Sequence, residues 1–549
     1  MRSRGGGPEI GESPGLPILG DNAPTVLPSI FNDVIGPVMR GPSSSHCAAA
    51  VRIGRLARDL MGGELDEVLV EFHPAGSLAT THRSQGSDMG LFGGLLGWEA
   101  TDDRLVGSEE AIREAGVSVD IRITEFQAFH PNTYRMTLRG GGVEHRMTAV
   151  STGGGIIRVE TIDGFPVKVA GDFHETLVFF GDGTGGEGWE RLPGSPQDGL
   201  GADAVILHAS PNGPLIQIKS QDPISPEALG SHLEGFEPSE IRRLEPVLPI
   251  RSRIGMTVPF LCASELEGAA GSSGAGLWEL AAQYESVRGG ISEEEVLSRM
   301  EEIVRIMERS VAEGLAGTEY PDRILPPQTG QYRTHLEKGA LLDAGMLNRI
   351  ILHISAIMEV KSSMGVVVAA PTAGSCGALP AAVLGAGQVL DSTNEEMAKA
   401  MLAAGLIGIF ITAGSTFAAE VCGCQAECGA GSAMAAAALV SLKGGSRQQA
   451  LAAASMALQN TLGMICDPVA NRVEVPCLGR NVLAASNALA CANMALAGFQ
   501  EVIPLDEVIQ AMDEVGKAMP HELRCTALGG LSVTDSSRRI QERLEKNER

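Results

Sequence analysis

The second half of the chain is dominated by small apolar residues. Alanine is abundant from about residue 365 onward, and the whole chain contains 69 glycines. Because small side chains let helices pack closely, this half predicts a large, dense helical interior. Two segments are apolar enough to resemble membrane spans, Ala400 to Ala419 and Ala433 to Leu442. We interpret both as buried core helices, since a net charge of −25 is typical of a soluble protein.

Length and charge limit what the chain can do. Its 549 residues predict roughly three to four domains. Its 67 acidic residues outnumber its 42 basic ones and would repel a phosphate backbone, and only 4% of residues are aromatic. We therefore expect no nucleic-acid partner and no membrane partner. Residues 1–27 are rich in glycine and proline and lack an apolar signal core, which predicts a flexible leader on a cytoplasmic protein.

The apolar pattern predicts an N-terminal α/β domain followed by a mostly all-α domain. Alternating strands and glycine turns run through residues 28–159, and residues 160–255 form an extra α/β module or an extended linker. Helices dominate residues 256–549. The clearest expected elements are strands at 65–73, 117–126 and 133–142, strands in ETLVFFGD, ADAVILHAS and GPLIQIKS, and a helix over 292–315 with Ser292 and Glu295 as a capping box.

The chain has ten cysteines, and seven of them lie between residues 376 and 491. Without a signal peptide a disulfide framework is not expected, so the clustering indicates a metal, an iron–sulfur cluster or a reactive thiol. We expect Cys262, Cys422 and Cys491 to be small buried hydrophobic residues instead.

One polar loop precedes a helix in the first domain. GPSSSH (41–46) offers three hydroxyl groups and an imidazole just before an Ala/Arg-rich helix, with Ser45 or a neighbour as its N-cap. A helix N-terminus with such donors suits a carboxylate or phosphate, and the imidazole of His46 could also take a proton. The alternative interpretation is an N-cap loop with a structural histidine.

A second polar loop lies in VVVAAPTAGSCGALPAAVLG (366–385). A strand ends at Pro371, a Thr/Gly/Ser loop follows, and a helix begins near Leu379. This strand–loop–helix arrangement can bind anions at backbone N–H groups, although no lysine follows the glycines as in a P-loop. An ordinary tight turn is the alternative.

The cysteines themselves show a distinctive spacing. Cys424 is followed after 41 residues by Cys466 and after ten more by Cys477. The last two lie in loop-like sequence whose free amides suit a sulfur-rich cluster. Spacing alone does not choose between Cys424 and Cys428, and zinc stays open although the second half lacks a paired C-x₂₋₄-C knuckle.

Several segments together resemble the iron–sulfur-dependent L-serine dehydratases of bacteria. The matching segments run from about residue 41 to 531: GPSSSH, GSLA (76–79), HPNT (130–133), STGGG (151–155), APTAGSCGALP (370–380), GCQAECG (423–429), ICDPV (465–469), EVPC with RN (474–477, 480–481) and LGG (528–530). The resemblance implies a β domain related to a regulatory domain of phosphoglycerate dehydrogenases, followed by an all-helical catalytic domain in one chain.

The resemblance also implies a chemistry. The family's [4Fe-4S] cluster would be held by Cys424, Cys466 and Cys477, and its fourth iron would act as a Lewis acid on the β-hydroxyl of L-serine. The products would be pyruvate and ammonia, which places the protein in amino-acid catabolism and gluconeogenesis. We expect a small amino-acid substrate and a homodimer. The site residues expected are His46, Ser44 and Ser45 in catalysis and Ser43, Thr372, Ser375, Asn132 and Arg480 in substrate binding.

This sequence departs from the family's pattern at three positions. Gln85 stands where the family has a histidine, Lys361 where it has an asparagine, and Gly479 where it has a lysine. Glutamine cannot exchange a proton at neutral pH, and the nearest histidine, His82, lies three residues earlier. The C-terminal cysteine of some members is absent, since this chain ends in EKNER. Two alternatives therefore stay open, an iron–sulfur lyase for another small β-substituted amino or hydroxy acid, and a non-catalytic metal-binding regulatory protein.

Overall fold

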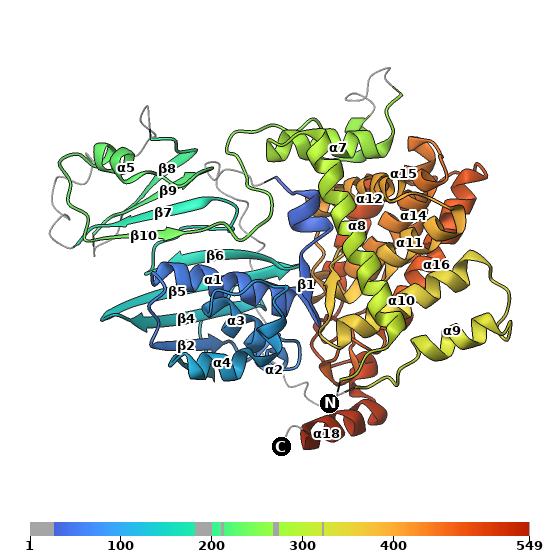
Figure 1. Ribbon diagram of the computed structural model, residues 1–549, viewed down its shortest axis with the longest axis horizontal. Coiled ribbons are helices and arrows are strands. Elements are labelled where there is room, and N and C mark those ends of the chain that lie inside the picture. The colour runs from blue at the N-terminus through green and yellow to red at the C-terminus, as the bar shows by residue number, and fades with distance from the viewer. Residues whose placement is uncertain (1–26, 182–199, 210–212, 267–273, 321–322, 548–549) are drawn as a thin grey trace, which may run out of the picture.

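The computed structural model describes residues 27–181, 200–209, 213–266, 274–320 and 323–547. Two sheets with their helices lie on one side of the molecule, and a helical body lies on the other (Figure 1). This confirms the expected fold class, an α/β region followed by a mostly helical one. The expected leader falls almost entirely outside the described residues.

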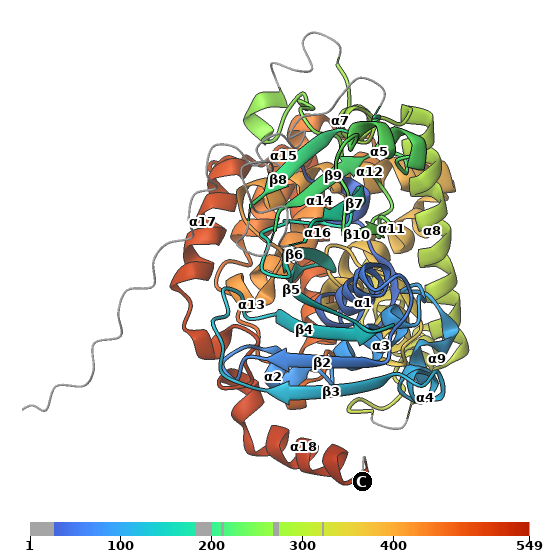
Figure 2. The same ribbon diagram turned by 90° about the vertical axis from the view of Figure 1, so that its left-hand side faces the viewer.

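The first sheet has five strands in the order β3-β2-β4-β5-β6, with β2 and β3 parallel and the other pairs antiparallel. Alternate residues of its strands are buried under α1 and α3, which cover one face (Figure 2). The strands expected at 65–73, 117–126 and 133–142 are confirmed. The elements are α1 (Ala49–Leu60), β2 (Glu67–Phe72), α2 (Leu78–Thr81), α3 (Ser87–Leu95), α4 (Ser108–Glu114), β3 (Ser118–Ile123), β4 (Thr133–Gly140), β5 (Val143–Gly153) and β6 (Ile156–Ile162).

Glycines allow α1 and α3 to pack closely. A Cβ atom on Gly90 would lie 2.2 Å from the carbonyl oxygen of Cys47, and one on Gly94 would lie 2.2 Å from that of Val51. Any larger residue at these two positions would push α3 away from α1. This contact fixes the start of α1, which follows the serine loop.

The second sheet has four antiparallel strands in the order β10-β7-β9-β8. Leu177, Leu215 and Leu244 on one face pack against the first domain, whereas Val178 and Ile218 on the other face form a separate small core. The three strands expected in this region are confirmed. The elements are β7 (His174–Phe179), β8 (Ala204–His208), β9 (Leu215–Ser220), α5 (Pro226–His232) and β10 (Glu240–Leu244).

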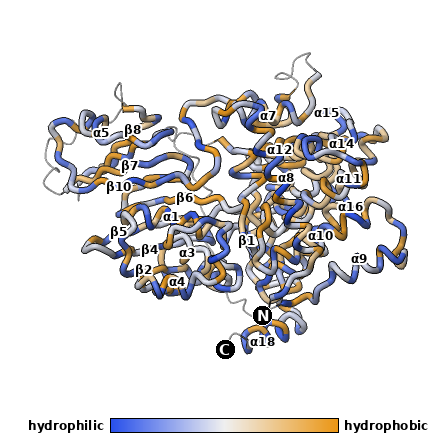
Figure 3. Tube along the Cα trace, in the orientation of Figure 1, coloured by the Kyte–Doolittle hydropathy of each residue, from blue (hydrophilic) through white to orange (hydrophobic). Residues whose placement is uncertain are grey.

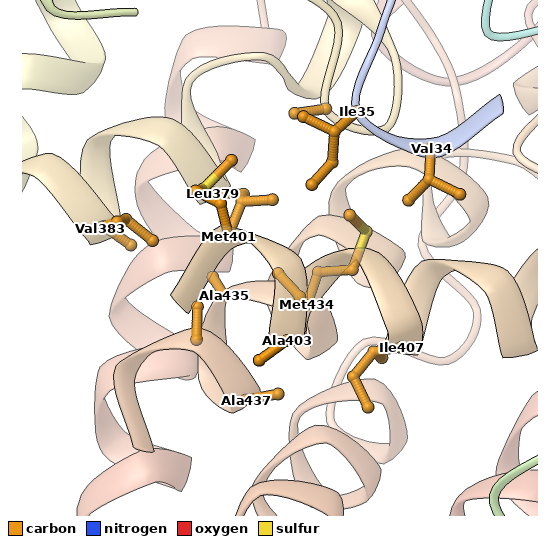
Figure 4. Close-up of a cluster of buried hydrophobic side chains, with 14 of the residues drawn as sticks. Val34, Ile35, Leu379, Val383, Met401, Ala403, Ile407, Met434, Ala435 and Ala437 are labelled. Atoms are coloured by element: carbon orange, nitrogen blue, oxygen red, sulfur yellow. The ribbon is translucent and has the colours of Figure 1, made fainter. Parts of the chain in front are cut away.

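The helical body is built around α12 and α14. Alanine and methionine side chains from these helices interdigitate at its centre (Figure 4). The helix expected over 292–315 is α8, and Ser292 Oγ accepts the Glu295 amide as expected for its cap. The helices are α7 (Leu277–Gly289), α8 (Glu293–Ala316), α9 (Thr329–Glu337), α10 (Met346–Ser362), α11 (Ala378–Leu390), α12 (Asn394–Gly414), α13 (Ala419–Cys422), α14 (Ala430–Leu442), α15 (Arg447–Gln459), α16 (Cys477–Leu496), α17 (Leu505–Ala518) and α18 (Asp535–Asn547).

Two segments are long and apolar enough to cross a membrane, Ala373–Leu390 and α12. Their apolar windows are 83% and 78% buried inside the protein, as in the core helices of a soluble protein, and the apolar stretches lie within the helical body (Figure 3). The expected segment 400–419 extends past the end of α12, and α14 has only 13 residues.

The segment that precedes α1 links the first domain to the helical body. Val34 and Ile35 are fully buried in the helical core, and a Cβ on Gly408 would lie only 2.0 Å from Val34 Cγ1. Immediately after this segment, β1 (Val38–Arg40) pairs with β11 (Val366–Val368) in an antiparallel ribbon. The serine loop at 41–46 leaves β1, and the Thr372 loop follows β11. The ribbon therefore brings both polar loops to the junction between the two bodies.

Candidate active site

A small cavity opens at this junction. Its wall combines the serine loop of the first domain with loops and helix ends of the helical body. The residues that line it include Ser43, Ser44, Ser45, Gln85, Thr372, Gly374, Glu420, Glu427, Cys466, Val473, Cys477 and Cys525. Residues of both predicted polar loops and two of the three predicted cluster cysteines thus share one space.

The serine loop enters α1 through an irregular turn, Ser44–Ala48. Ser43 precedes this turn and makes no cap hydrogen bond, and Ala48 is the N-cap residue of α1 itself, so the serine cap expected for this helix is not formed. The hydroxyl of Ser44 accepts the backbone N–H of Ala373 at 3.2 Å, which links this loop to the Thr372 loop. The serine side chains are thus left to face the cavity instead of closing the helix end.

His46 lies behind the serines and is 1% exposed. Thr81 Oγ1 donates to the carbonyl oxygen of Ser77 at 2.6 Å. His46 Nε2 lies 2.8 Å from Thr81 Oγ1 and must therefore be the donor in that contact. The other ring nitrogen, Nδ1, is then unprotonated and faces the hydroxyls of Ser43 and Ser45 at 3.1 and 3.2 Å. Burial lowers the pKa of His46 to about 4, so the ring is neutral at pH 7 and is available as a base.

The Thr372 loop is held by hydrogen bonds within the loop and to Asn481. Ser375 is fully buried, and the Thr372 and Ser375 side chains each bond the backbone amide of the other. Asn481 Oδ1 accepts the amides of Gly377 and Ala378 at 3.0 and 2.9 Å, while its Nδ2 donates to the Cys477 carbonyl oxygen at 2.8 Å. The loop is therefore fastened to the start of α16, where Cys477 lies.

Five cysteine thiols gather on the helical side. Cys424, Cys428, Cys466 and Cys525 pack in one cluster, and Cys477 lines the cavity beside Cys466 and Cys525. Backbone bonds hold Cys466 against the segment that ends in Cys525, since Cys466 N donates to Leu523 O and Cys525 N donates to Cys466 O. All ten cysteines are free thiols, with Cys422 and Cys491 buried as expected. Cys262 is only half-buried beside Ser264, so that expectation was wrong.

The thiols differ in how readily they ionise. The pKa of Cys424 is lowered to about 7, chiefly by a hydrogen bond from the Cys428 thiol, with Arg480 acting in the same direction. Burial raises the pKa of Cys477 to about 12, and the thiol of Cys525 and burial both raise the pKa of Cys466. Only thiolates bind metals, so a metal at this site would release protons from Cys466 and Cys477.

The thiols at the cavity are of the kind that hold an iron–sulfur cluster. Among the described residues, no group of three His, Cys, Asp or Glu side chains converges to hold one metal ion. Cys466 and Cys477 line the cavity, and Cys424 packs in the thiol cluster that contains Cys466, so three cysteines from separate segments lie at the site. Cysteine thiolates are the ligands that an iron–sulfur cluster takes. Cys428, the alternative to Cys424, is buried behind it, 3.9 Å from the amide of Asn481.

Two carboxylate side chains in the cavity wall were not among the site residues predicted from the sequence. Glu420 accepts hydrogen bonds from Ser45 at 3.2 Å and Asn132 at 3.4 Å, and it thereby joins the two bodies. Glu427 accepts the Thr372 hydroxyl at 2.6 Å, and burial raises its pKa to about 8. The signal for Glu427 was its place between two cysteines in an otherwise small and apolar run, GCQAECGAG.

The comparisons with known proteins agree with this arrangement. Residues 271–532 match the family described as Serine dehydratase alpha chain. The L-serine dehydratase alpha chain of Peptoniphilus asaccharolyticus is 35% identical over 280 residues, which cover 51% of this chain and 96% of that protein. The probable L-serine dehydratase alpha chain of Bacillus subtilis is 36% identical over 46% of this chain and 84% of that protein.

This chain belongs to the L-serine dehydratase family. It also matches the probable L-serine dehydratase beta chain of Bacillus subtilis, with 38% identity over 28% of this chain and 69% of that protein. A single chain here therefore contains regions that are named as separate alpha and beta chains in that relative.

The residues expected in substrate binding by an L-serine dehydratase fall into two groups. Ser43 and Thr372 line the cavity together with Ser44 and Ser45. Ser375, Asn132 and Arg480 do not line it but hold its wall: Ser375 braces the Thr372 loop, Asn132 bonds Glu420, and Arg480 donates to Asp467 at 2.6 Å. A direct contact between these last three and a substrate stays a prediction.

Of the three departures from the family pattern, only Gln85 lines the cavity. Lys361 is fully buried behind the wall and donates to the carbonyl oxygen of Val473. Gly479 lies at an exposed position on α16. His82 is paired with Asp88 at 2.7 Å and does not line the cavity. The departure at Gln85 is therefore the one that bears directly on ligand contact.

Proposed function

We propose that this protein is a cytoplasmic L-serine dehydratase that converts L-serine to pyruvate and ammonia with a [4Fe-4S] cluster. The observation that carries this proposal is one cavity lined by Ser43–Ser45, Thr372, Cys466 and Cys477 in a chain of this family. A homodimer and a role in amino-acid catabolism and gluconeogenesis belong to the same proposal.

Cys424, Cys466 and Cys477 would hold the cluster. When bound, the cluster supplies a Lewis-acid iron for the departing β-hydroxyl, which is a poor leaving group on its own. The protein's part is to present three thiolates from separate segments. Arg480 lies close enough to favour the Cys424 thiolate, and Asn481 fixes the first turn of α16 at Cys477.

The serine and Thr372 loops would orient the substrate. A hydroxyl contact alone leaves a small amino acid free to rotate, so a second anchor is needed, and the carboxylate is the natural handle. Ser43, Ser44 and Ser45 place hydroxyl groups in the wall at the start of α1, where partial positive charge attracts an anion. The Thr372 loop closes the opposite side.

His46 would accept the Cα proton. Its unprotonated Nδ1 points at Ser43 and Ser45, and these hydroxyls lie between the ring and the cavity. Because the Ser45 hydroxyl donates its proton to Glu420, a proton leaving Cα reaches the imidazole by way of the Ser43 hydroxyl, which gives up its own proton to Nδ1 as it receives the new one. Glu420, bonded to Ser45, favours the imidazolium that results.

The reaction balances without a further reagent. Loss of the Cα proton and the β-hydroxyl, which leaves as water, gives aminoacrylate. Aminoacrylate tautomerises to an imine, and water hydrolyses the imine to pyruvate and ammonia. No electrons are exchanged with the protein.

Anaerobic purification followed by an assay of keto-acid release from a panel of hydroxy-amino acids tests the proposal. We expect a brown protein with several irons per chain and turnover of L-serine. A colourless protein with stoichiometric zinc and no turnover would support a non-catalytic metal-binding role. Turnover of another amino acid in place of L-serine would retain the chemistry and change the substrate.

A further inference from the structure

Gln85 is a buried amide with an unused donor in the cavity wall. The residue is 3% exposed, and its Nε2 has no hydrogen-bond acceptor among the described residues. Nearly all buried polar groups in folded proteins have a partner, so an orphan donor in a ligand cavity points to a ligand as the missing acceptor. A glutamine Nε2 donates and never accepts, which restricts that ligand group to an oxygen with lone pairs.

The position of Gln85 is fixed by the same residue that holds His46. The Gln85 backbone N–H donates to the carbonyl oxygen of Thr81 at 2.9 Å, and the Thr81 hydroxyl binds His46 Nε2 at 2.8 Å. The next residue, Gly86, has φ +88°, and a Cβ there would lie 3.3 Å from Cδ of Pro42. The turn that bears Gln85 thus packs directly on the serine loop.

The charged side chains that line the cavity are all acidic. Two carboxylates, Glu420 and Glu427, line the cavity, and no lysine, arginine or histidine is among the lining residues. A ligand carboxylate must therefore be held by neutral donors, whereas a ligand cation placed beside Glu427 favours loss of the proton that burial keeps on this carboxyl group at pH 7. Among the described residues Glu427 accepts one hydrogen bond, from Thr372, while Glu420 is already shared by Ser45 and Asn132.

We propose that Gln85 and Glu427 hold the two ends of an α-amino acid and select it against the corresponding α-hydroxy acid. Gln85 Nε2 donates to the substrate carboxylate beside the serine hydroxyls, and Glu427 accepts the α-ammonium group. This inference rests on the proposed function, because it names the groups that read the substrate of that same site. An α-hydroxy acid such as glycerate would leave the Glu427 carboxylate without its cation.

Three small molecules separate the two contacts. L-serine carries both charged groups, glycerate lacks the ammonium, and serinol carries a hydroxymethyl group in place of the carboxylate. The inhibition constants of glycerate and serinol against L-serine turnover, together with the KM of L-serine, are measured for the wild type, Gln85→Glu, Gln85→Leu and Glu427→Gln. Gln510→Glu and Glu542→Gln, both exposed on remote helices, serve as matched controls.

We expect each variant to weaken the binding of only those molecules that carry the group it contacts. The two Gln85 variants weaken L-serine and glycerate by roughly tenfold to a hundredfold but leave serinol unchanged, because a hydrogen bond to a charged group is lost. Glu427→Gln weakens L-serine and serinol by a similar factor and leaves glycerate unchanged or stronger. Iron content and the melting temperature stay at wild-type values in the Gln85 variants.

Failure of this inference is distinguishable from failure of the proposed function. If the wild type turns over L-serine and the Gln85 variants bind all three molecules as the wild type does, the contact is wrong and the enzyme stands. If both Gln85 variants weaken all three molecules equally, Gln85 supports the fold and reads no carboxylate. If the wild type turns over no amino acid, calorimetric titration with the same molecules applies the same criterion to binding alone.

Discussion

The two walls of the cavity differ in chemistry and in how they are built. The wall from the first domain presents neutral donors, Ser43, Ser44, Ser45 and Gln85, on loops that enter α1 and α3. The wall from the helical body presents thiols and carboxylates on loops fastened to α14 and α16. The neutral donors of the first-domain wall can orient a ligand without competing for a metal. The thiols and carboxylates of the helical wall can hold a metal without repelling a cation on the ligand. Changes in the two walls should therefore have separable effects.

The largest effect is expected in the helical wall. Changing Cys466 or Cys477 to alanine removes one of three predicted ligands, so iron per chain should fall to a small fraction and turnover should be nearly abolished. Iron content and activity are measured after anaerobic purification. Cys491→Ala, a buried thiol bonded to Asn460 and Asn487, is the matched control and should keep both.

The first ligand is tested by a pair of variants. Cys424→Ala should lose iron, whereas Cys428→Ala should retain it, since Cys428 is buried behind Cys424 as a hydrogen-bond donor. The reverse result would make Cys428 the ligand. Full iron in both would mean that this segment contributes none.

Exposure to air should inactivate the metal site in the helical wall and leave the rest of the protein folded, so this test needs no mutation. A cluster with one iron open to ligands loses that iron to oxidants, while the large apolar cores of the helical body stay folded. We expect activity to disappear within hours of aeration while the circular dichroism spectrum is unchanged, compared with a sample kept anaerobic. Activity that survives aeration would argue against an open iron.

The loops that form each wall could be predicted from local sequence, but the contact between the two walls could not. The serine loop, the Thr372 loop and the cysteine spacing are all local patterns. The ribbon of β1 and β11 that unites them has three residues per strand, too few for an alternating pattern to specify its partner. Backbone hydrogen bonds between segments distant in the sequence place Cys525 beside Cys466. Glu427 lies in the wall because neighbouring residues hold its turn in place. Neither placement produces a periodic pattern in the sequence.

The middle sheet shows the same limit. Its strands were predicted from the sequence, but the buried pair of Glu175 and Lys219 on its inner face was not, because charged residues normally mark the exposed face of a strand. They tolerate burial here because the two are bonded to each other and Gln217 also donates to Glu175.

In the first domain's wall, His46→Ala should lower kcat/KM by about a hundredfold to ten-thousandfold without loss of iron, if the ring receives the Cα proton. The pH profile gives a second check. Because the pKa of His46 is lowered from 6.5 to about 4, the folded protein keeps the ring neutral between these values while the unfolded chain protonates it, so this residue costs stability as pH falls from about 6.5 to 4.

Urea unfolding at pH 7 and pH 5 should therefore show a smaller loss of stability in His46→Gln than in the wild type. His208→Ala, a half-buried histidine bonded to Gln217 in the second sheet, is the control for kinetics and should leave kcat/KM unchanged. Wild-type turnover in His46→Ala would leave the ring a structural role only.

The smallest effect expected is that of Ser44→Ala. Its hydroxyl is 3% exposed, lines the cavity and accepts the Ala373 amide, so its loss removes a donor to the substrate carboxylate and one link between the two walls. Loss of a hydrogen bond to a charged group costs about 1.5–3 kcal/mol, or roughly tenfold to a hundredfold in kcat/KM. Iron content should not change, because the thiols lie in the other wall. Ser455→Ala is a matched control, since Ser455 is equally buried and bonds the Ile503 carbonyl oxygen far from the cavity. If Ser44→Ala and His46→Ala both retain normal kinetics, the serine loop is only the entry to α1 and has no part in binding substrate.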